Sequence, residues 1–504
     1  MHDRAYRLGD QPLLKERSTE DTAIVHGKHR VSFAQLNDRA HQFASGVQAS
    51  GLGVGHRLLL LTPNRPEVFE VLIGAARVGV VVVPMNWRLS PNELLDIAIE
   101  AQADGIVVDP SLAHLVADVI SQLDPRLVIT LGVEFEAWLR RPWPEPVPVA
   151  AAADTVVLQI YTSGTSGRPK AVLITNQNLS AKVVGVAPLW GLGADSTTLL
   201  VTPLFHVGAL SWGLTGLNAA ATTRLADDAT AATLARHLRV DGITHAFLVP
   251  VMFPGLCKAL GPRVDLPALR LIVYGASPIT LQVQADAMRT FGSRLRQLYG
   301  MSETTGAFTE MPIDPNPAQN ERALQSVGRP YPWVDVEIHD PATGQRLSDG
   351  IVGEVWTRSD QNTIGYMGQP GPTGDLLTPE GWLRTGDGGY LSTDGLLFLT
   401  DRIKDLIISG GENVLPTEVE DVLASHPDVA ESAVFGVPDA RWGETVAAAV
   451  VCRFGSKVDA EDLLRFAADR LAGYKRPRRI LFVEDLPRNA SGKIIRRDPQ
   501  EATT

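Results

Sequence analysis

The sequence predicts an α/β protein: a large N-terminal domain of βα-type sheets with a small antiparallel β subdomain, then a small α+β C-terminal domain. The first observation is the length of 504 residues, which exceeds what one hydrophobic core usually serves. The second is an alternation of helical stretches with short β-branched runs over about the first three hundred residues. The third is a change after residue 326 to short segments broken by Gly, Pro, Asp and Asn.

The βα units are clearest in residues 66–84. A helix there ends at Gly79, which can take the left-handed cap conformation, and the four valines of residues 80–83 follow as a buried strand. The same pattern predicts further buried strands at residues 107–108, 156–160, 199–201, 244–249 and 271–274. Such units build parallel sheets with helices packed on their faces.

The last part of the chain divides into two kinds of structure. Antiparallel strands are predicted at residues 333–338, 353–357 and 395–399. Beyond the charged run 401–405, helices and strands are predicted at residues 416–425, 431–437, 445–452 and 460–471. We therefore expect a large domain over residues 1–402 and a small one over residues 403–504.

Composition excludes several classes of protein. The 46 basic and 57 acidic residues give a net charge of -11, and no basic stripe with interleaved aromatics is present, which argues against nucleic-acid binding. Cys257 and Cys452 lie far apart, without metal-like or redox-like spacing. The polar N-terminus has no signal-peptide core, and the apolar run 71–83 is interrupted by Arg77 and Gly79. We expect a cytoplasmic protein without a membrane span; peripheral membrane contact and oligomeric state stay open.

Residues 161–170 have the composition of a phosphate-binding loop, and they follow the strand predicted at residues 156–160. Glycines let backbone N–H groups turn toward a phosphate, hydroxyls add donors, and Lys170 adds a positive charge. The loop is not a Walker A motif, because Pro169 stands where that motif needs glycine. Taken alone, the run is also compatible with an ordinary Ser/Gly-rich turn.

The loop resembles the phosphate-loop signature of the adenylate-forming superfamily, which contains acyl-CoA synthetases, adenylation domains of peptide synthetases and beetle luciferases. Other motifs of that superfamily follow in the same order over nearly the whole chain. They lie at residues 203–208, 274–278, 299–305, 385–387, 401–405, 409–413 and 487–493.

The resemblance implies an ATP site in which Tyr299 stacks on adenine, and Asp387 and Arg402 bind the ribose. An aromatic face suits a purine, and a carboxylate such as Glu303 is a hard ligand for Mg²⁺. The implied ATP- and AMP-binding residues are Thr162, Ser163, Gly164, Thr165, Ser166, Gly167, Lys170, Gly275, Ala276, Ser277, Tyr299, Gly300, Thr304, Asp387, Arg402 and Lys493.

The implied catalytic residues are Lys493, Thr304, Glu303 and Lys170. A carboxylate must attack an α-phosphorus surrounded by negative oxygens, so the protein mainly positions the reactants and neutralises charge. In the second half-reaction of the family, the small, mobile domain turns about a hinge, here Lys404, and a thiol attacks the adenylate. The implied coenzyme A contacts are Ser409, Gly410 and Gly411.

The acid pocket is implied to contain His206, which can gate it; a packed core histidine is the alternative. Further lining is expected from Val207, Phe247, Gly300 and Met301. We identified no Arg or Lys that would grip a second carboxylate, which favours a hydrophobic monocarboxylic acid, fatty or aryl.

The predicted function is that of an ATP-dependent, AMP-forming acyl-CoA synthetase, with ATP, Mg²⁺ and coenzyme A as cofactors and substrates. The nearest alternative is a free-standing adenylation enzyme that loads a carrier protein. A nucleotide-binding module without catalysis is a third possibility, although candidates for every catalytic role are present.

Overall fold

The computed structural model describes residues 7–10, 21–146, 152–162, 169–262, 264–312, 323–402, 407–409, 412–414, 416–439, 442–488 and 494. The chain divides into two compact units. One comprises Met1–Asp335 with Arg358–Gly381, and the other comprises Val336–Thr357 with Trp382–Thr504. The boundary expected after Arg402 stays a prediction.

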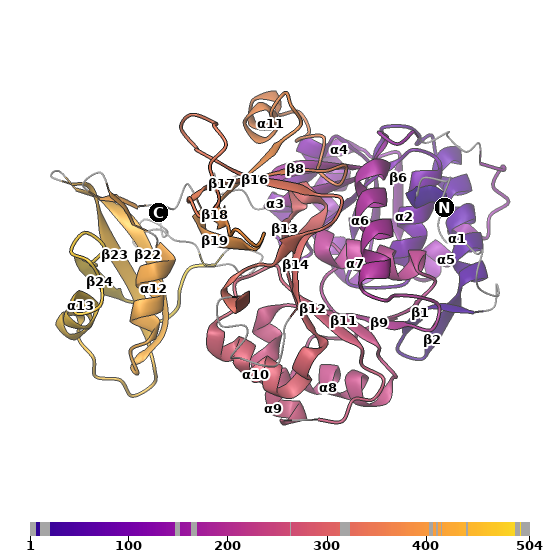
Figure 1. Cartoon of the computed structure of the whole chain (residues 1–504). Coiled ribbons are helices and arrows are strands. Elements are labelled where there is room, and N and C mark those ends of the chain that lie inside the picture. Colours follow the sequence, from indigo (N-terminus) through magenta and orange to yellow (C-terminus); the bar gives the residue numbers. More distant parts are fainter. Residues whose placement is uncertain are drawn as a thin grey trace. The chain divides into compact units, whose positions relative to one another are not determined.

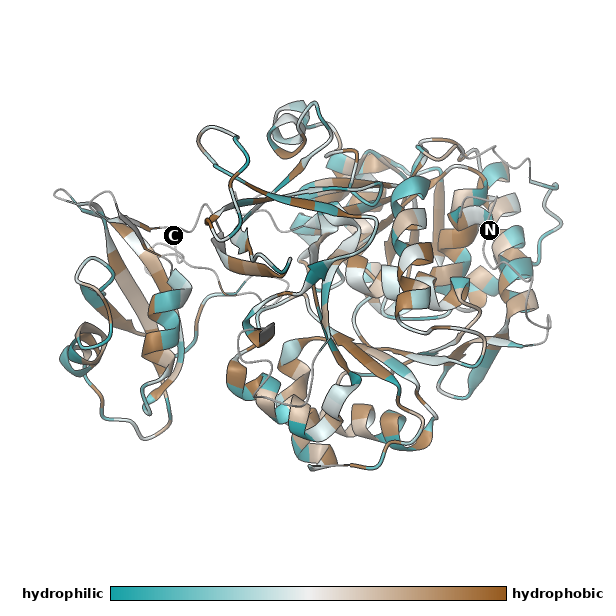
Figure 2. Cartoon of the chain, viewed as in Figure 1, coloured by the Kyte–Doolittle hydropathy of each residue, from teal (hydrophilic) through white to brown (hydrophobic). Residues whose placement is uncertain are grey.

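The first sheet of the first unit has the strand order β15-β14-β13-β12-β11-β9-β10-β1-β2. Its central strands, from β13 to β1, pair in parallel, and antiparallel partners close both edges. The strands are β1 Thr22–His26, β2 His29–Ser32, β9 Thr197–Leu200, β10 Thr222–Leu225, β11 His245–Leu248, β12 Leu271–Tyr274, β13 Leu295–Met301, β14 Gly306–Pro312 and β15 Arg329–Pro330. Strand β12 is buried at every position, and Figure 2 shows it as apolar.

The second sheet has the order β6-β5-β3-β4-β7-β8. It is parallel except for the β7–β8 pair, which is antiparallel and frames the predicted phosphate loop. The strands are β3 Arg57–Leu61, β4 Val81–Pro84, β5 Ala103–Val108, β6 Leu127–Thr130, β7 Val156–Thr162 and β8 Lys170–Thr175.

Four helices lie between these two sheets: α1 Phe33–Ala49, α2 Glu67–Arg77, α6 Asn176–Leu189 and α7 Val207–Asn218 (Figure 1). Helix α7 contacts β9, β10 and β14, whereas α2 contacts β4, α6 contacts β8, and α6 packs on α7. Almost every residue of α7 is buried, as expected for a helix that is apolar around almost its whole circumference. The remaining helices of the unit are α3 Pro91–Ala101, α4 Ala117–Leu123, α5 Val133–Leu139, α8 Ala231–Val240, α9 Phe253–Leu260, α10 Leu281–Phe291 and α11 Pro370–Leu376.

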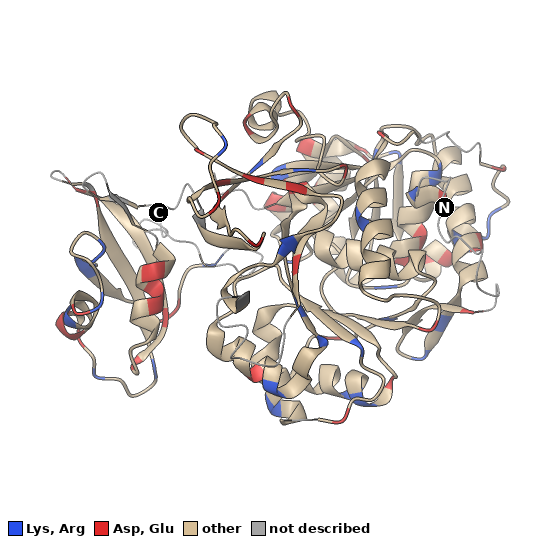
Figure 3. Cartoon of the chain, viewed as in Figure 1, with Lys and Arg blue, Asp and Glu red and all other residues tan. Residues whose placement is uncertain are grey.

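The described residues of the second unit form two sheets. The antiparallel one consists of β16 Asp335–His339, β17 Gly353–Arg358, β18 Leu383–Leu391 and β19 Leu397–Arg402. The C-terminal one consists of β20 Ile407–Ser409, β21 Glu412–Val414, β22 Val429–Asp439, β23 Gly443–Cys452 and β24 Arg479–Phe482. Helices α12 Pro416–Ala424 and α13 Ala460–Ala468 accompany it. Acidic residues of α12 are visible in Figure 3, and one of them, Glu418, binds Lys475 at 2.7 Å.

The predicted α/β fold class is confirmed, and residues 271–274 form a strand with the predicted bounds. The strand predicted at residues 395–399 begins instead at Leu397, because Gly395 takes a positive φ of 80° in the preceding turn. Strand β18 was not predicted, since glycine is uncommon in strands. A Cβ atom on Gly389 would lie 2.5 Å from the Phe398 carbonyl oxygen, so glycine there lets β18 and β19 approach.

No helix among the described residues combines the length and the apolar composition that a membrane span needs. Both cysteines are free and partly buried.

Candidate active site

The ends of the predicted phosphate loop are fixed by the β7–β8 pair. Thr162 lies opposite Lys170 in the antiparallel register, and its hydroxyl lies 3.5 Å from the Lys170 carbonyl oxygen. The loop residues between them that were implied to bind ATP lie outside the described residues: Ser163, Gly164, Thr165, Ser166 and Gly167. The structure therefore places the two ends of the loop side by side, as a phosphate-binding turn requires.

Lys170 and Glu303 meet through Tyr366, which sequence reasoning missed. The ammonium nitrogen of Lys170 lies 4.8 Å from the centroid of the Tyr366 ring, a cation–π contact. The Tyr366 hydroxyl donates to Glu303 Oε1 at 2.8 Å. One buried aromatic side chain thus connects the cation of the phosphate loop with the carboxylate predicted to bind Mg²⁺.

The backbone around Tyr366 is held against β8. Met367 N donates to the Ala171 carbonyl at 2.9 Å, and Leu173 N donates to the Gly365 carbonyl at 3.0 Å. Thr363 N donates to the carbonyl oxygen of Glu303 itself at 2.7 Å. Tyr366 and Glu303 are 63 positions apart in sequence, so no spacing signal could have paired them.

Glu303 and Thr304 lie on a single helical turn, Ser302–Thr304, and both are buried. The Thr304 hydroxyl donates to the Gly306 carbonyl at 2.7 Å and accepts from Met301 N at 3.1 Å. The side chain of Gln361 supports the turn from behind, donating to the Thr304 carbonyl at 2.8 Å. Hydrogen bonds from the surrounding protein therefore position this turn.

The predicted adenine residues lie at the carboxyl ends of two adjacent parallel strands, β12 and β13. Gly275 follows β12, and a Cβ atom there would lie 2.5 Å from the Leu298 carbonyl oxygen, so only glycine allows this approach. Ala276 has a positive φ of 70°, and both it and Ser277 are exposed. Half-buried Tyr299 packs edge-on against Phe308 at 4.9 Å. Ligands of open α/β sheets commonly bind beyond such strand ends.

The predicted acid-pocket residues surround the start of α7. The His206 ring lies 4.4 Å from the Phe205 ring, and burial, aided by the charge of Arg88, lowers the pKa of His206 to about 4. A Cβ atom on Gly208 would lie 3.2 Å from Phe247 Cε1, so Phe247 closely approaches the first turn of α7. His206 is consequently neutral near pH 7 and can serve as a polar but uncharged wall.

The other predicted pocket residues are Val207, Gly300 and Met301. Val207 is buried as the first residue of α7, whereas Gly300 and Met301 are half-buried at the end of β13. A Cβ atom on Gly300 would lie 2.2 Å from the Gly306 carbonyl oxygen, so this position has no room for a side chain.

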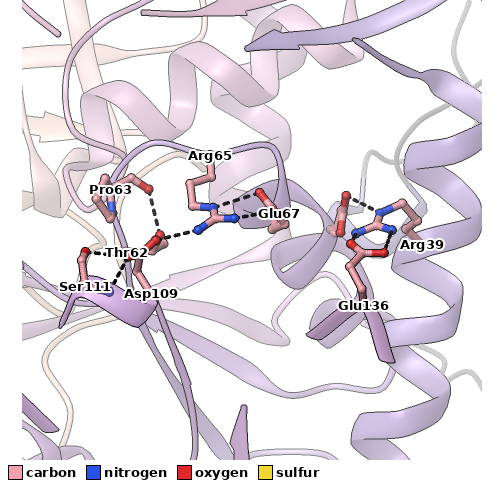
Figure 4. Close-up of polar contacts among 9 residues, drawn as sticks. Arg39, Thr62, Pro63, Arg65, Glu67, Asp109, Ser111 and Glu136 are labelled. Atoms are coloured by element: carbon pink, nitrogen blue, oxygen red, sulfur yellow. Dashed lines mark hydrogen bonds and ion pairs between the residues drawn. The ribbon is translucent and has the colours of Figure 1, made fainter. Parts of the chain in front are cut away.

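Asn64 positions the segment that precedes His206. Its amide donates to the Thr202 carbonyl at 2.9 Å, and its side-chain oxygen accepts from Leu204 N at 2.8 Å. The turn carrying Asn64 is fixed in its place by Arg65, which donates to Asp109 at 2.6 Å and pairs with Glu67 at 2.8 Å (Figure 4). The hydrogen bonds of Asn64 have no sequence signal, because they join positions 138 and 140 residues apart.

The second unit carries the predicted ribose residues. Asp387 and Arg402 are paired in the β18–β19 register, and Asp387 N donates to the Thr385 hydroxyl at 3.1 Å. Ser409, at the end of β20, is buried and lies opposite Glu412. The side chain of Arg402 lies outside the described part of the structure, as do Lys404, Gly410, Gly411 and Lys493.

Comparison with known sequences identifies the family. The profile of the AMP-binding enzyme matches residues 14–367, and that of the AMP-binding enzyme C-terminal domain matches residues 418–493. The chain belongs to the AMP-binding enzyme family. It is thereby a member of the adenylate-forming superfamily.

Relatives of this AMP-binding enzyme match over more than nine-tenths of its length. The fatty acid–acyl-carrier-protein ligase ScoC of Streptomyces coeruleorubidus is 36% identical over 485 residues, covering 94% of this chain and 92% of that protein. A feruloyl-CoA synthase of Amycolatopsis sp is 34% identical over 494 residues, 97% of each. The ATP-bound structure of MatB from Rhodopseudomonas palustris has a TM-score of 0.88 at 28% identity and 97% coverage of each chain. This AMP-binding enzyme is an ATP-dependent, AMP-forming acid–thiol ligase.

Glu303 is the side chain of this site that the sequence predicts as a metal ligand. No group of three or more His, Cys, Asp or Glu side chains within the described ranges could hold a metal. Glu303 offers one buried carboxylate, whose Oε1 already accepts from Tyr366. Mg²⁺ commonly binds through one or two carboxylates and takes its other ligands from phosphates and water.

Proposed function

We propose that this enzyme condenses a hydrophobic monocarboxylic acid with ATP at the site described above and transfers the acyl group to coenzyme A. The observation that carries the proposal is the Lys170–Tyr366–Glu303 arrangement beside the buried turn of Thr304. It gathers a cation, a carboxylate and a hydroxyl, which are the groups that phosphoryl chemistry needs for positioning and charge neutralisation.

In the first half-reaction, a carboxylate oxygen of the acid attacks the α-phosphorus of ATP and pyrophosphate leaves. Lys170 neutralises charge on the departing pyrophosphate, and Thr304 donates to an α-phosphate oxygen once its hydroxyl turns from the Gly306 carbonyl. Glu303 would hold Mg²⁺, which would neutralise charge on the phosphates when bound. Lys493 contacts both the acid and the α-phosphate.

In the second half-reaction, the thiol of coenzyme A attacks the acyl carbonyl carbon, and AMP leaves with the bonding electron pair. Asp387 and Arg402 hold the ribose of the nucleotide. The segment with Ser409, Gly410 and Gly411 borders the pantetheine arm, and Lys404 is the hinge about which the small domain turns between the two steps. This alternation is part of the proposal and is based on the resemblance to the family.

The acid is proposed to be fatty or aryl. The walls offered by Val207 and Phe247 are apolar, and His206 is neutral because burial lowers its pKa. The feruloyl-CoA synthase relative has an aryl acid in its name and the ScoC relative a fatty acid, which supports both classes for this chain.

A second candidate function, loading of a carrier protein, is favoured by the 36% identity to a fatty acid–acyl-carrier-protein ligase. The two functions share the first half-reaction and differ only in the thiol that attacks the adenylate.

The test is a product assay over a panel of fatty and aryl acids with ATP and Mg²⁺, in which the thiol is coenzyme A, a phosphopantetheinylated carrier protein or absent. The proposal predicts acid-dependent pyrophosphate release and an acyl-CoA product. Acylation of the carrier protein but not of coenzyme A would favour the second candidate function. The absence of acid-dependent pyrophosphate release with every acid would contradict both functions.

A further inference from the structure

Lys182 is a buried cation that the proposed mechanism does not use. It lies in α6, and the residue is 2% exposed. Its ammonium nitrogen donates to the Ala307 carbonyl at 2.7 Å and lies 3.5 Å from the Tyr331 hydroxyl. The rings of Tyr331 and Trp190 cover it, with centroids at 4.5 and 5.4 Å. All of these neighbours are neutral.

The charge of Lys182 is left without a close counter-charge in the described part of the chain. Glu310 is the acidic residue that acts on it, but one Glu310 oxygen accepts from Trp190 Nε1 at 2.8 Å and the other lies 3.9 Å from Arg296. Burial lowers the pKa of Lys182 to about 7, and Glu310 only partly opposes this. Burying an ammonium without a close counter-charge is unfavourable, so the presence of Lys182 here calls for a functional explanation.

The place of Lys182 in the fold indicates what that function is. Helix α6 packs on α7, which begins in the predicted acid pocket (Figure 1). In the β13–β14 pair, Gly300 lies opposite Ala307 and Met301 lies opposite Gly306. Lys182 therefore contacts the strand that backs the pocket residues Gly300 and Met301.

Gly306 leaves this wall without a side chain. A Cβ atom there would lie 3.3 Å from Ser211 Oγ and 3.8 Å from Lys182 Cε. The Ser211 hydroxyl and the Lys182 side chain thus lie beside a backbone position that carries no side chain of its own. An ammonium has three donors, and Lys182 has partners for two among the described residues.

We propose that Lys182 recognises a hydrogen-bond-accepting oxygen at the end of the acid opposite its reacting carboxylate. The inference rests on the proposed function and sharpens its substrate class to an otherwise apolar acid with a distal hydroxyl or carbonyl oxygen. Such a pocket discriminates strongly, because an analogue without the oxygen leaves the buried ammonium without that partner.

The experiment compares matched acids that differ only in the distal oxygen: 4-hydroxycinnamate with cinnamate, and 8-hydroxyoctanoate with octanoate. The measured quantity is the ratio of kcat/KM for acid-dependent pyrophosphate release within each pair. In the unaltered enzyme, we expect the oxygen-bearing acid of at least one pair to be favoured by roughly tenfold or more.

Lys182→Met should bring that ratio to about one while the apolar acid keeps activity within a few-fold, because the substitution removes the donor and retains the apolar stem. The matched control is Lys258→Met, on an exposed position of α9, which should leave the ratio unchanged. Lys182→Arg retains a charged donor and should keep part of the preference.

If Lys182→Met lowered kcat/KM equally for both acids of a pair, Lys182 would only position the Ala307 carbonyl. That result would overturn the proposal. A ratio near one for both pairs in the unaltered enzyme would overturn it even if no variant folds. Acid-dependent pyrophosphate release without a preference for the oxygen-bearing acid contradicts this inference alone. The absence of pyrophosphate release with every acid contradicts the proposed function.

Discussion

At the scale of single residues, the site depends on side chains that sequence motifs do not mark. Tyr366 fixes Glu303 through a hydrogen bond and Lys170 through its ring. Gln361 holds the Thr304 carbonyl, and Asn64 holds the segment ahead of His206. Each of these residues orients a predicted site residue, and replacing a residue that orients a metal ligand typically weakens metal binding by about 10- to 100-fold.

The first prediction concerns Tyr366→Phe, which removes the hydroxyl and keeps the ring over Lys170. We expect the Mg²⁺ concentration for half-maximal adenylate formation to rise about tenfold, because Glu303 loses the bond that orients it. Calorimetric titration with ATP should show weaker binding with Mg²⁺ present and unchanged binding without it.

The control is Tyr390→Phe, at a β18 position stacked on Phe398, which should leave both measurements unchanged. An unaltered Mg²⁺ requirement in Tyr366→Phe would refute the orienting role of its hydroxyl.

The second prediction concerns Glu70, which lies in α2 with its side chain 2% exposed. Burial raises the pKa of Glu70 to about 7 and outweighs the 2.7 Å bond from Arg39. A raised folded-state pKa contributes stability at low pH that is lost as the pH rises through 7. Glu70→Gln removes this titration, so its thermal midpoint relative to the unaltered protein should increase between about pH 5 and about pH 8.

Glu136 is the matched control, because it binds the other side of Arg39 (Figure 4) but is more exposed. The hydrogen bond from Arg39 lowers the pKa of Glu136. The thermal midpoint of Glu136→Gln, relative to the unaltered protein, should therefore not increase over that pH range. The same increase in both variants would contradict a raised pKa at Glu70.

At the scale of elements, the active site lies beside strand pairs whose backbones approach so closely that only glycine fits between them. The β13–β14 pair is the tightest case, since a Cβ atom on Gly300 would lie 2.2 Å from the Gly306 carbonyl oxygen and 2.4 Å from Ala307 Cα. This approach sets the separation between Tyr299 and the turn of Thr304. The hairpin is thus a rigid support for the nucleotide and acid sites.

The third prediction is that Gly300→Ala forces β13 and β14 apart. We expect destabilisation of about 1–3 kcal/mol, as for other overpacked sites, with loss of adenylate formation. Gly374→Ala is the control, because α11 leaves open space around Gly374 and alanine favours helix. A fully active Gly300→Ala enzyme with an unchanged thermal midpoint would contradict the role of this close approach.

The elements also show what sequence patterns can predict. Continuous apolar runs such as residues 80–83 and 271–274 were identified because buried parallel strands are apolar on both faces. Strand β18 was missed because its glycines serve close packing, which depends on a neighbour that the sequence does not specify. Motif residues that are neighbours in sequence, such as Glu303 and Thr304, lie together on one buried turn.

At the scale of the whole molecule, the contacts that sequence reasoning could not predict are long-range. The bonds Tyr366–Glu303, Gln361–Thr304 and Lys182–Ala307 join residues 63, 57 and 125 positions apart. Tertiary packing alone determines such pairs. The resemblance to the adenylate-forming superfamily supplied the order of the motifs, and the match of both AMP-binding profiles along the chain confirms the family.

The fourth prediction separates the two half-reactions. Lys493→Ala should abolish adenylate formation, because the α-phosphate and the acid lose their shared cation, while thioester formation from supplied acyl-adenylate continues. The measurement is single-turnover product analysis of each half-reaction. Equal loss in both steps would refute the role assigned to Lys493.

Exchange of labelled pyrophosphate into ATP reports directly whether the chain activates a carboxylic acid as its adenylate. Acyl-adenylate formation is reversible, so we expect exchange that requires both Mg²⁺ and a fatty or aryl acid and needs no thiol. Exchange that is absent with every acid, or that proceeds equally without acid, would show that the chain does not form an acyl-adenylate from these acids.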